Sequence, residues 1–295
     1  MARLLCEAMK GSSLQLKAHD FALTLAPNVG GSVAAFTSKG RDILRPLPLG
    51  ASDPLQGAGF PLFPFSGRID HGRFSFGGKN YALPPNFFPE PHAIHGQAWQ
   101  APWVVEAQTP TSATLSYHHD AGIWPWAYRA EQKFRLCAEG LILDLALTNL
   151  ADAPMPAGLG WHPYFPAAGA TLQADVMHIW RSGADMIPAE PEPLGDDDLT
   201  EPRLVDELAF DNNFTAGSGG VTLTWPDGFA VKMQAEAMPH LVVYTPPDAG
   251  FFCVEPVTHA PNAVNSDLPS SISGVKTLLP RENLQRRISI TVLQK

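Results

Sequence analysis

Apolar and polar residues alternate in short runs along most of this chain of 295 residues. Alternation with a period of two is typical of a β-strand that buries one face, because successive side chains of a strand point to opposite sides. The pattern therefore predicts many short strands, of which the clearest lie at residues 14–18, 21–25, 114–117, 141–147, 221–225, 229–233 and 287–292.

A tight hairpin is predicted where Gly77-Gly78 separates residues 73–76 from residues 79–83, because glycines readily take the positive φ angles of a two-residue turn. Long helical patterns are nearly absent, and 29 prolines and 25 glycines interrupt the chain too often for extended helices. We therefore expect an all-β protein, a sandwich or a large open barrel, that forms a single domain over residues 1–295.

Two segments, 46–72 and 84–101, have few alternating runs and are rich in proline, glycine and aromatic residues. Loops of this kind, carried on a rigid sheet, are common places for binding and catalytic residues. Residues 188–202 are acidic and proline-rich. We expect a solvated surface loop there, because the acidic side chains lack the spacing of a calcium-binding loop.

Composition narrows the classes of function. A net charge of −9 argues against a general binder of nucleic acid, which needs clustered Lys and Arg. No apolar stretch approaches the roughly 20 residues of a membrane span. Residues 1–10 lack the long apolar run of a secretory signal, so we expect a soluble, cytoplasmic protein without a membrane partner. Cys6, Cys137 and Cys253 are widely spaced and are expected to be reduced thiols.

The most specific chemistry lies in two distant segments, Gly-Leu-Gly-Trp-His-Pro-Tyr-Phe at 158–165 and Phe-Phe-Cys-Val-Glu-Pro at 251–256. His162 stands among aromatic residues, and Glu255 ends an apolar, strand-like run. A histidine and a carboxylate in a semi-apolar cleft can act as acid and base near neutral pH. A glutamate is rarely buried without a partner or a purpose, which favours a functional role for Glu255.

Three further residues are candidate binding groups. Arg68 can fork onto a carboxylate or onto sugar hydroxyls, with a structural ion pair as the equal alternative. His95 lies in an aromatic loop, where a packed and hydrogen-bonded side chain is the alternative. Asp211, followed by two asparagines, can bind several hydroxyl groups or form a turn between strands.

Taken in chain order, these residues resemble the aldose 1-epimerase, or galactose mutarotase, family. The resembling motifs are Gly-Arg-Ile-Asp-His-Gly-Arg-Phe, Ile-His-Gly, Trp-His-Pro-Tyr-Phe, Phe-Asp-Asn-Asn-Phe and Val-Glu-Pro. The resemblance implies a large antiparallel β-sandwich and an isomerase that interconverts the anomers of a monosaccharide without cofactor or metal. It implies Glu255 as general base and His162 as general acid. It also implies that Arg68, His95 and Asp211 hold sugar hydroxyls.

The chain departs from the family at Gly67, Gln97 and Trp161, where the family often has Asn, Gly and Asn. These differences concern the preferred sugar more than the chemistry. A branch of the family acts on hexose 6-phosphates, which would require a cationic pocket. Arg68, Arg73 and Lys79 are candidates for one, whereas the acidic balance of the chain does not favour it.

Three other interpretations are consistent with parts of the pattern. One is a carbohydrate-binding sandwich without catalysis, and another is a glycoside hydrolase that pairs Asp211 with Glu255. The third is a metal-dependent enzyme built on His92, His95 and His162. For mutarotation, we expect an ionised Glu255 beside a protonated His162, each supporting the other's charge. The sequence contains no phosphate loop and no dinucleotide fingerprint, in line with an enzyme that needs no cofactor.

Overall fold

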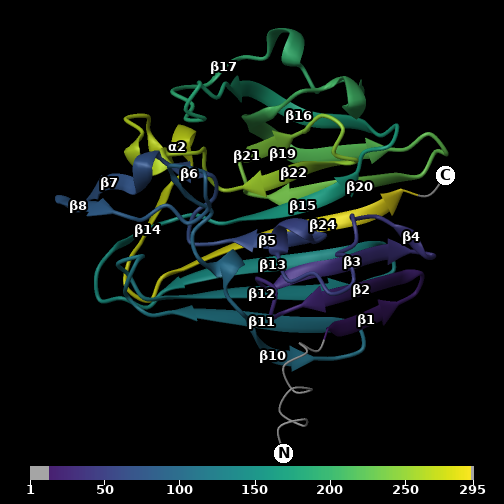
Figure 1. Ribbon diagram of the computed structural model, residues 1–295, viewed down its shortest axis with the longest axis horizontal. Helices are drawn as coiled ribbons and strands as arrows, with labels where there is room; N and C mark the ends of the chain where they lie inside the picture. The colour runs from purple at the N-terminus through teal and green to yellow at the C-terminus, as the bar shows by residue number, and fades with distance from the viewer. Residues whose placement is uncertain (1–12, 294–295) are drawn as a thin grey trace, which may run out of the picture.

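The computed structural model describes residues 13–293 of the chain. Cys6 and residues 1–10, on which the expectation of no secretory signal depends, lie outside the described residues. Strands dominate the described chain (Figure 1). None of its helices has the length and apolar content needed to cross a membrane.

Most strands join one antiparallel sheet of 18 strands. They are β1 (Leu14–Ala18), β2 (Phe21–Ala26), β3 (Ser32–Ser38), β4 (Arg41–Asp42), β5 (Gly59–Leu62), β10 (Val104–Gln108), β11 (Ser112–His119), β12 (Tyr128–Leu136), β13 (Gly140–Asn149), β15 (Gly160–Pro166), β16 (Thr171–Trp180), β17 (Glu192–Pro193), β18 (Arg203–Leu204), β19 (Asp211–Thr224), β20 (Ala230–Glu236), β21 (His240–Tyr244), β22 (Phe251–Val257) and β24 (Asn283–Leu293).

Three small two-stranded sheets and a few short helices complete the described structure. The sheets pair β6 (Arg68–Ile69) with β9 (Ala93–Ile94), β7 (Arg73–Phe76) with β8 (Lys79–Ala82), and β14 (Met155–Ala157) with β23 (Lys276–Leu278). The helices are η1 (Pro54–Gln56), η2 (Asp70–Gly72), η3 (Ala98–Gln100), η4 (Gly195–Asp197), η5 (Val205–Glu207), η6 (Ala263–Asn265) and α2 (Ser270–Ser273).

The large sheet doubles over into two layers because the long strand β19 belongs to both (Figure 1). Residues 211–215 of β19 pair with β21, and residues 220–224 pair with β20. One layer, the β15 layer, runs β1-β2-β3-β5-β15-β22-β21-β19. The other, the β13 layer, runs β10-β11-β12-β13-β24-β20-β19.

A continuous apolar core extends through both layers. Leu23 and Phe36 contribute to it from the β15 layer, and Leu143 and Ile288 from the β13 layer. Burial alternates along β2 and over most of β12 and β13, as expected for strands with one face against this core. The prediction of an antiparallel all-β sandwich is confirmed. That residues 1–295 form a single domain stays a prediction.

Local predictions from the sequence are also confirmed. Each predicted alternating run lies in a strand to within one residue. In the predicted hairpin, Phe76 pairs with Lys79 across Gly77 and Gly78, whose φ angles are 57° and 74°. The free thiols in the described chain are Cys137 and Cys253.

One strand of the main sheet was missed, because residues 46–72 were expected to be irregular. β5 lies within this segment and pairs with β15 and β3. All four residues of β5 are buried, so its sequence shows no alternation of apolar and polar positions. β15 and β22 are also buried on nearly every residue. Burial on both faces hides the two-residue period by which strands are recognised.

A second, smaller apolar cluster explains this two-sided burial. It lies apart from the main core and includes Phe60 of β5, Tyr164 of β15 and Cys253 of β22. Ile94 and Trp99, from the irregular segment 84–101, complete its contacts with the sheet. The β15 layer is therefore covered on its outer face as well, which creates a dry environment for any polar side chain placed there.

Gly96 provides a test of this covering loop. A Cβ atom at Gly96 would lie 1.9 Å from the carbonyl oxygen of Phe63, and its φ of +68° disfavours other residues. We expect Gly96→Ala to lower the free energy of unfolding by more than about 2 kcal/mol. Gly77→Ala is the matched control, because Gly77 also has a positive φ but has no atoms near the added Cβ. Gly77→Ala should lower the free energy of unfolding by about 1 kcal/mol. Equal losses in urea unfolding would contradict the close packing of the loop.

Candidate active site

Neighbouring strands of the β15 layer bring polar side chains into one row across the sheet. His162 on β15 pairs with Phe60 on β5. The antiparallel register between β15 and β22 places His162 opposite Glu255. Glu255 in turn pairs with Val242 on β21, and Val242 pairs with Asn213 on β19. Residues that are distant in the chain therefore become neighbours through strand pairing alone.

His162 and Glu255 are in direct contact. The Nε2 atom of His162 lies 3.1 Å from Oε1 of Glu255. Both residues are buried, with 7% and 3% of their surface exposed. The imidazole stacks on the rings of Phe60 and Tyr164, at centroid distances of 4.6 and 4.8 Å, and these two rings are neighbours of each other at 6.1 Å. These two rings hold the imidazole in the orientation that meets the carboxyl group.

Burial disfavours charge on both members of the pair. It lowers the pKa of His162 from 6.5 to about 3. It also raises the pKa of Glu255 well above 4.5, an effect that the negative charge of Asp211 increases and the positive charge of Arg68 offsets. These directions differ from the expected ionised Glu255 and protonated His162. The reason is that both groups are buried and the opposite charge around them is too weak to support an ion.

The pair nevertheless has the proton count that acid–base chemistry requires. A neutral carboxyl beside a neutral imidazole contains the same single proton as a carboxylate beside an imidazolium. The two forms differ only by transfer of that proton across the 3.1 Å contact between His162 and Glu255. A polar ligand that hydrogen-bonds to the charged form would favour it over the neutral form.

Arg68 and His95 are held by two loop segments that support each other. β6 and β9 pair Arg68 with Ile94. The backbone N–H of Gly67 donates to Nδ1 of His95 at 3.0 Å, and the N–H of His95 donates to the Gly67 carbonyl at 2.9 Å. Burial, with the nearby charges of His162 and Arg68, lowers the pKa of His95 well below 6.5. A neutral His95 whose Nδ1 accepts a hydrogen bond carries its proton on Nε2, which is free to donate.

Arg68 lies between two carboxylates. Its Nε atom is 3.1 Å from Oε2 of Glu90, and its Nη2 atom is 3.7 Å from Oδ2 of Asp211. Burial raises the pKa of Asp211, while the charge of Arg68 lowers it. The ion-pair interpretation of Arg68 is confirmed. Sugar binding by Arg68 stays a prediction and is compatible with it, because one guanidinium can pair with an acid and still present other N–H groups.

These residues surround a cleft of about 300 Å³, within the size range of sites for small molecules. All five predicted site residues line it. The full lining consists of Leu55, Gly67, Arg68, Phe87, Ile94, His95, Trp99, His162, Tyr164, Ser182, Met186, Asp211, Asn212, Asn213, Val242, Tyr244, Phe251, Glu255 and Pro261.

Comparison with known proteins identifies the family. Residues 12–291 match the family model described as aldose 1-epimerase. The chain belongs to the aldose 1-epimerase family. The uncharacterized Escherichia coli K12 protein YphB is 32% identical over 218 residues, which cover 69% of this chain and 73% of YphB. The suspected resemblance to this family is thereby confirmed.

Solved structures of related fold cover nearly the whole chain. The E. coli K12 protein b2544 is 27% identical, with a TM-score of 0.88 over 96% of this chain and 99% of b2544. A galactose mutarotase-like protein from Clostridium acetobutylicum is 20% identical, with a TM-score of 0.88 over 96% of this chain and 95% of its own. The likeness to the C. acetobutylicum protein shows that the two chains share the same fold.

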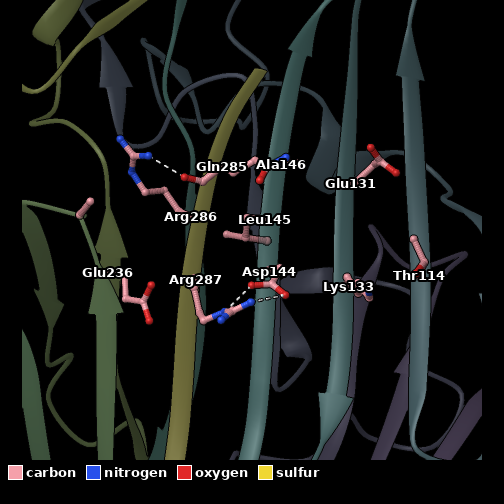
Figure 2. A pocket seen from close by; sticks show the side chains of 11 residues that line it. Thr114, Glu131, Lys133, Asp144, Leu145, Ala146, Glu236, Gln285, Arg286 and Arg287 are labelled. Atoms are coloured by element: carbon pink, nitrogen blue, oxygen red, sulfur yellow. Dashed lines mark hydrogen bonds and ion pairs between the residues drawn. The ribbon is translucent and has the colours of Figure 1, made fainter. Parts of the chain in front are cut away.

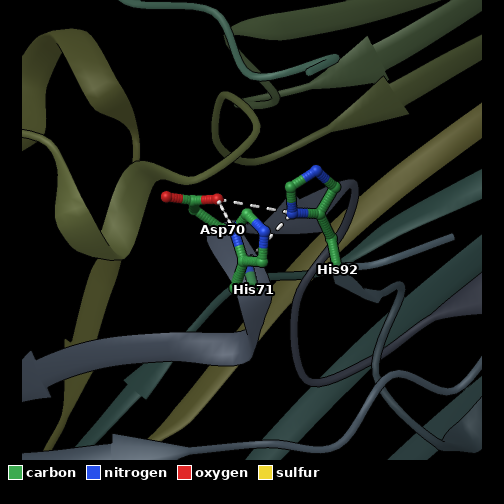
Figure 3. A group of neighbouring side chains, drawn as sticks. All are labelled: Asp70, His71 and His92. Atoms are coloured by element: carbon green, nitrogen blue, oxygen red, sulfur yellow. Dashed lines mark hydrogen bonds and ion pairs between the residues drawn. The ribbon is translucent and has the colours of Figure 1, made fainter.

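Within this aldose 1-epimerase homologue, His92 lies away from the cleft, beside Asp70 and His71 (Figure 3). Its Nδ1 atom accepts the backbone N–H of His71 at 2.9 Å, and its Nε2 atom is 2.9 Å from the carbonyl oxygen of Asp185. Both ring nitrogens are thus engaged in holding the loop. The structure does not gather His92 with the two cleft histidines, as the hypothesis of a metal-dependent enzyme requires.

Another set of possible metal ligands lies at the floor of the cleft. The ligand atoms of His162, Cys253 and Glu255 lie within 4.8 Å of one another. Burial raises the pKa of the Cys253 thiol well above 9.0, and the charge of Glu255 adds to this effect. Since a metal binds the thiolate, this environment opposes the ligating form of Cys253.

Other residues singled out in the sequence are not part of the cleft lining. His259, four residues after Glu255 in the chain, is buried outside the cleft lining, and its Nε2 atom accepts the backbone N–H of Ser66 at 3.2 Å. Arg73 and Lys79 lie on the β7–β8 hairpin and do not line the cleft. The predicted cationic cluster around Arg68 is therefore not assembled.

The sequence interpretation overlooked two contributors to the cleft. Glu90 is the ion-pair partner of Arg68, with 14% of its side chain exposed. Its only sequence signal was a carboxylate between two prolines inside an aromatic loop. Tyr244 lines the cleft from β21, where it pairs with Asp211. A partly buried tyrosine at a strand end has no pattern that distinguishes it from a packing residue.

The buried carboxyl of Glu255 predicts a pH-dependent stability. Because its pKa is raised on folding, folded Glu255 keeps a proton that the unfolded chain loses above about pH 4.5. The stability contributed by this group is complete below that pH and falls as pH rises toward the folded pKa. Glu255→Gln should therefore become progressively more stable relative to the native protein above about pH 4.5. The difference should grow by up to about 1.4 kcal/mol per pH unit.

Urea unfolding of both proteins from pH 4 to pH 8 measures this difference. Glu201→Gln is the matched control, since Glu201 is an exposed glutamate. The difference in the free energy of unfolding between Glu201→Gln and the native protein should stay constant with pH. A constant difference between Glu255→Gln and the native protein across this range would contradict the burial of an uncompensated carboxyl group.

Proposed function

We propose that the protein is a mutarotase that interconverts the α and β anomers of a free aldose. The observation that carries the proposal is the 3.1 Å contact between His162 and Glu255 in a cleft lined by hydrogen-bonding groups. The anomeric hydroxyl and the ring oxygen of an aldose are bonded to the same carbon. Two side chains in contact with each other can therefore reach both oxygens at once.

The reaction needs only proton transfers at these two oxygens. In the reactive form, the Glu255 carboxylate removes the proton of the anomeric hydroxyl, and the His162 imidazolium protonates the ring oxygen. The bond between the anomeric carbon and the ring oxygen breaks as the carbonyl forms. Rotation about the adjacent carbon–carbon bond presents the other carbonyl face, and reversal of both transfers closes the ring as the other anomer.

The number of protons carried by His162 and Glu255 together stays constant through this cycle. Ring opening moves one proton to Glu255 and one away from His162, so the pair ends with a neutral carboxyl and a neutral imidazole. This product state matches the protonation that burial favours in the protein alone. The environment therefore favours the open-chain intermediate, in which neither side chain is charged.

The remaining polar groups suit the binding of sugar hydroxyls. His95 offers the Nε2–H donor, Asp211 offers acceptor oxygens, and Arg68 offers guanidinium N–H groups. Trp99 and Tyr164 add flat apolar surfaces that can contact the C–H face of a sugar ring. This mixture of aromatic and polar groups favours a monosaccharide as the ligand.

The acid–base pair is tested by Glu255→Gln and His162→Asn. Each should lower the rate of anomer exchange by about 100- to 10,000-fold, because each removes one proton-transfer group. Polarimetry on freshly dissolved α-glucose and α-galactose measures the rate. Glu201→Gln is the matched control and should exchange anomers at the native rate. Calorimetry should still detect sugar binding by Glu255→Gln.

Native exchange rates in Glu255→Gln would refute the assignment of Glu255. Sugar binding without any acceleration by the native protein would instead favour a non-catalytic carbohydrate-binding sandwich. Release of the coloured group from nitrophenyl glycosides would favour a glycoside hydrolase.

The cleft favours neutral sugars over hexose 6-phosphates. Arg68 is the only Lys or Arg in the described chain that lines it, and Glu90 and Asp211 already lie beside its guanidinium. We expect kcat/KM for glucose to exceed that for glucose 6-phosphate by at least about tenfold. Glu90→Gln, which removes one competing charge, should narrow this ratio. A native preference for the phosphate ester would contradict the prediction.

A further inference from the structure

Arg286 occupies an unusual position in the sheet. It lies on β24 with its side chain in phase with Leu284 and Ile288, which are buried in the apolar core. It pairs across the sheet with Leu145, another fully buried core residue. Arginine is among the residues least often found on such a face without a partner. The guanidinium therefore requires an explanation.

The neighbouring arginine shows the contrast (Figure 2). Arg287 projects toward Asp144, with nitrogen–oxygen distances of 2.6 and 3.2 Å. Arg286 projects away from this pair, and its Nη1 atom donates to the carbonyl oxygen of Gln285. Its Nε atom is buried without a hydrogen-bond partner, and Arg286 has no ion pair within the described chain. Burial lowers its pKa.

A cavity of about 320 Å³ lies beside this guanidinium. It is open to solvent and is bordered by the β19–β20 region, by α2 and by the start of β23. Arg286 and Lys276 line it together with the hydroxyl-bearing residues Ser218, Ser270 and Ser271. Lys276 also has no ion pair in residues 13–293. Two unpaired cations and several hydroxyl donors thus border one space.

Acidic residues are excluded from the lining of this cavity. No Asp or Glu is among its lining residues, although the chain has 29 acidic and 20 basic residues. Asp175 is an exposed residue outside this lining, and its carboxylate accepts the backbone N–H of Ser218 at 2.7 Å and also the Ser218 hydroxyl. The cavity shares no lining residue with the cleft that contains Glu255.

We propose that this cavity is a second binding site, specific for a tetrahedral oxyanion such as phosphate or the phosphoryl group of a small metabolite. The oxyanion would accept hydrogen bonds from the terminal guanidinium nitrogens of Arg286 and would meet the charge of Lys276. Serine hydroxyls would supply further donors. Such an anion balances two cations that have no ion pair within the described chain.

Calorimetric titration of the purified full-length protein with inorganic phosphate tests the proposal. The native protein should bind saturably, with a Kd on the order of 1 mM or tighter. Arg286→Met and Lys276→Met should each weaken binding by at least about tenfold. Arg135→Met is the matched control, because Arg135 is exposed on β12 and lines neither cavity. It should bind phosphate as the native protein does.

Additional ligands separate the sources of the oxyanion. Tighter binding of glycerol 3-phosphate than of phosphate indicates a phosphoester, and the reverse order indicates the free ion. Either order supports the site if Arg286→Met abolishes the difference. Equal binding of phosphate, acetate and chloride would mean an adventitious ion only, and would overturn the proposal. Unchanged phosphate binding in Arg286→Met and Lys276→Met would also overturn it.

Thermal unfolding distinguishes a ligand-binding arginine from a structural one. Without phosphate, Arg286→Met should be at least as stable as the native protein, because methionine removes a desolvated and unpaired charge. Phosphate should raise the Tm of the native protein and not that of Arg286→Met. A lower Tm of Arg286→Met in phosphate-free buffer would indicate a structural role. In that case phosphate binding by Lys276→Met is the deciding measurement, because Lys276 is exposed. Binding of phosphate by Lys276→Met with the native affinity would overturn the proposal.

Discussion

The buried contact between His162 and Glu255 is the interaction on which the organisation of the cleft depends. It joins two ionisable side chains on adjacent strands, and two neighbouring aromatic rings stack against the imidazole. Because the surroundings solvate neither charge, the pair holds one proton and favours the form in which both groups are neutral. Substrate hydrogen bonds are then the means by which the charged, reactive form becomes accessible.

This arrangement requires a sheet covered on both faces. The main core covers one face of the β15 layer, and the segment 84–101 covers the other with Ile94 and Trp99. The covering loop is also the source of His95 and of Glu90, the acid that holds Arg68. Packing and polar recognition are therefore built by the same segment. A defect in that loop would disturb both the dryness of the cleft floor and the position of its donors.

Charge is distributed differently at the two cavities. In the cleft, Arg68 lies between Glu90 and Asp211, so its positive charge is largely compensated within the protein. In the cavity beside α2, Arg286 and Lys276 have no such acids. Compensated charge suits recognition of neutral hydroxyl groups, whereas uncompensated charge suits an anion. The acidic net charge of the chain would not have revealed this local contrast.

The sequence by itself predicted several strands with one buried face and the glycine hairpin and, with the family resemblance, five candidate residues that line one cleft, because period-two alternation and rare polar residues in apolar runs are local signals. The place of Arg286 on the apolar phase of β24, and the cavity beside it, became visible only in the tertiary structure. Only the tertiary structure separated His95, which lines the cleft, from His92, which supports a loop. Only the tertiary structure showed β5 as a strand, paired Glu90 with Arg68, and made the His162–Glu255 pair neutral. These properties arise from burial and from contacts between distant segments, and neither is encoded in the local order of residues.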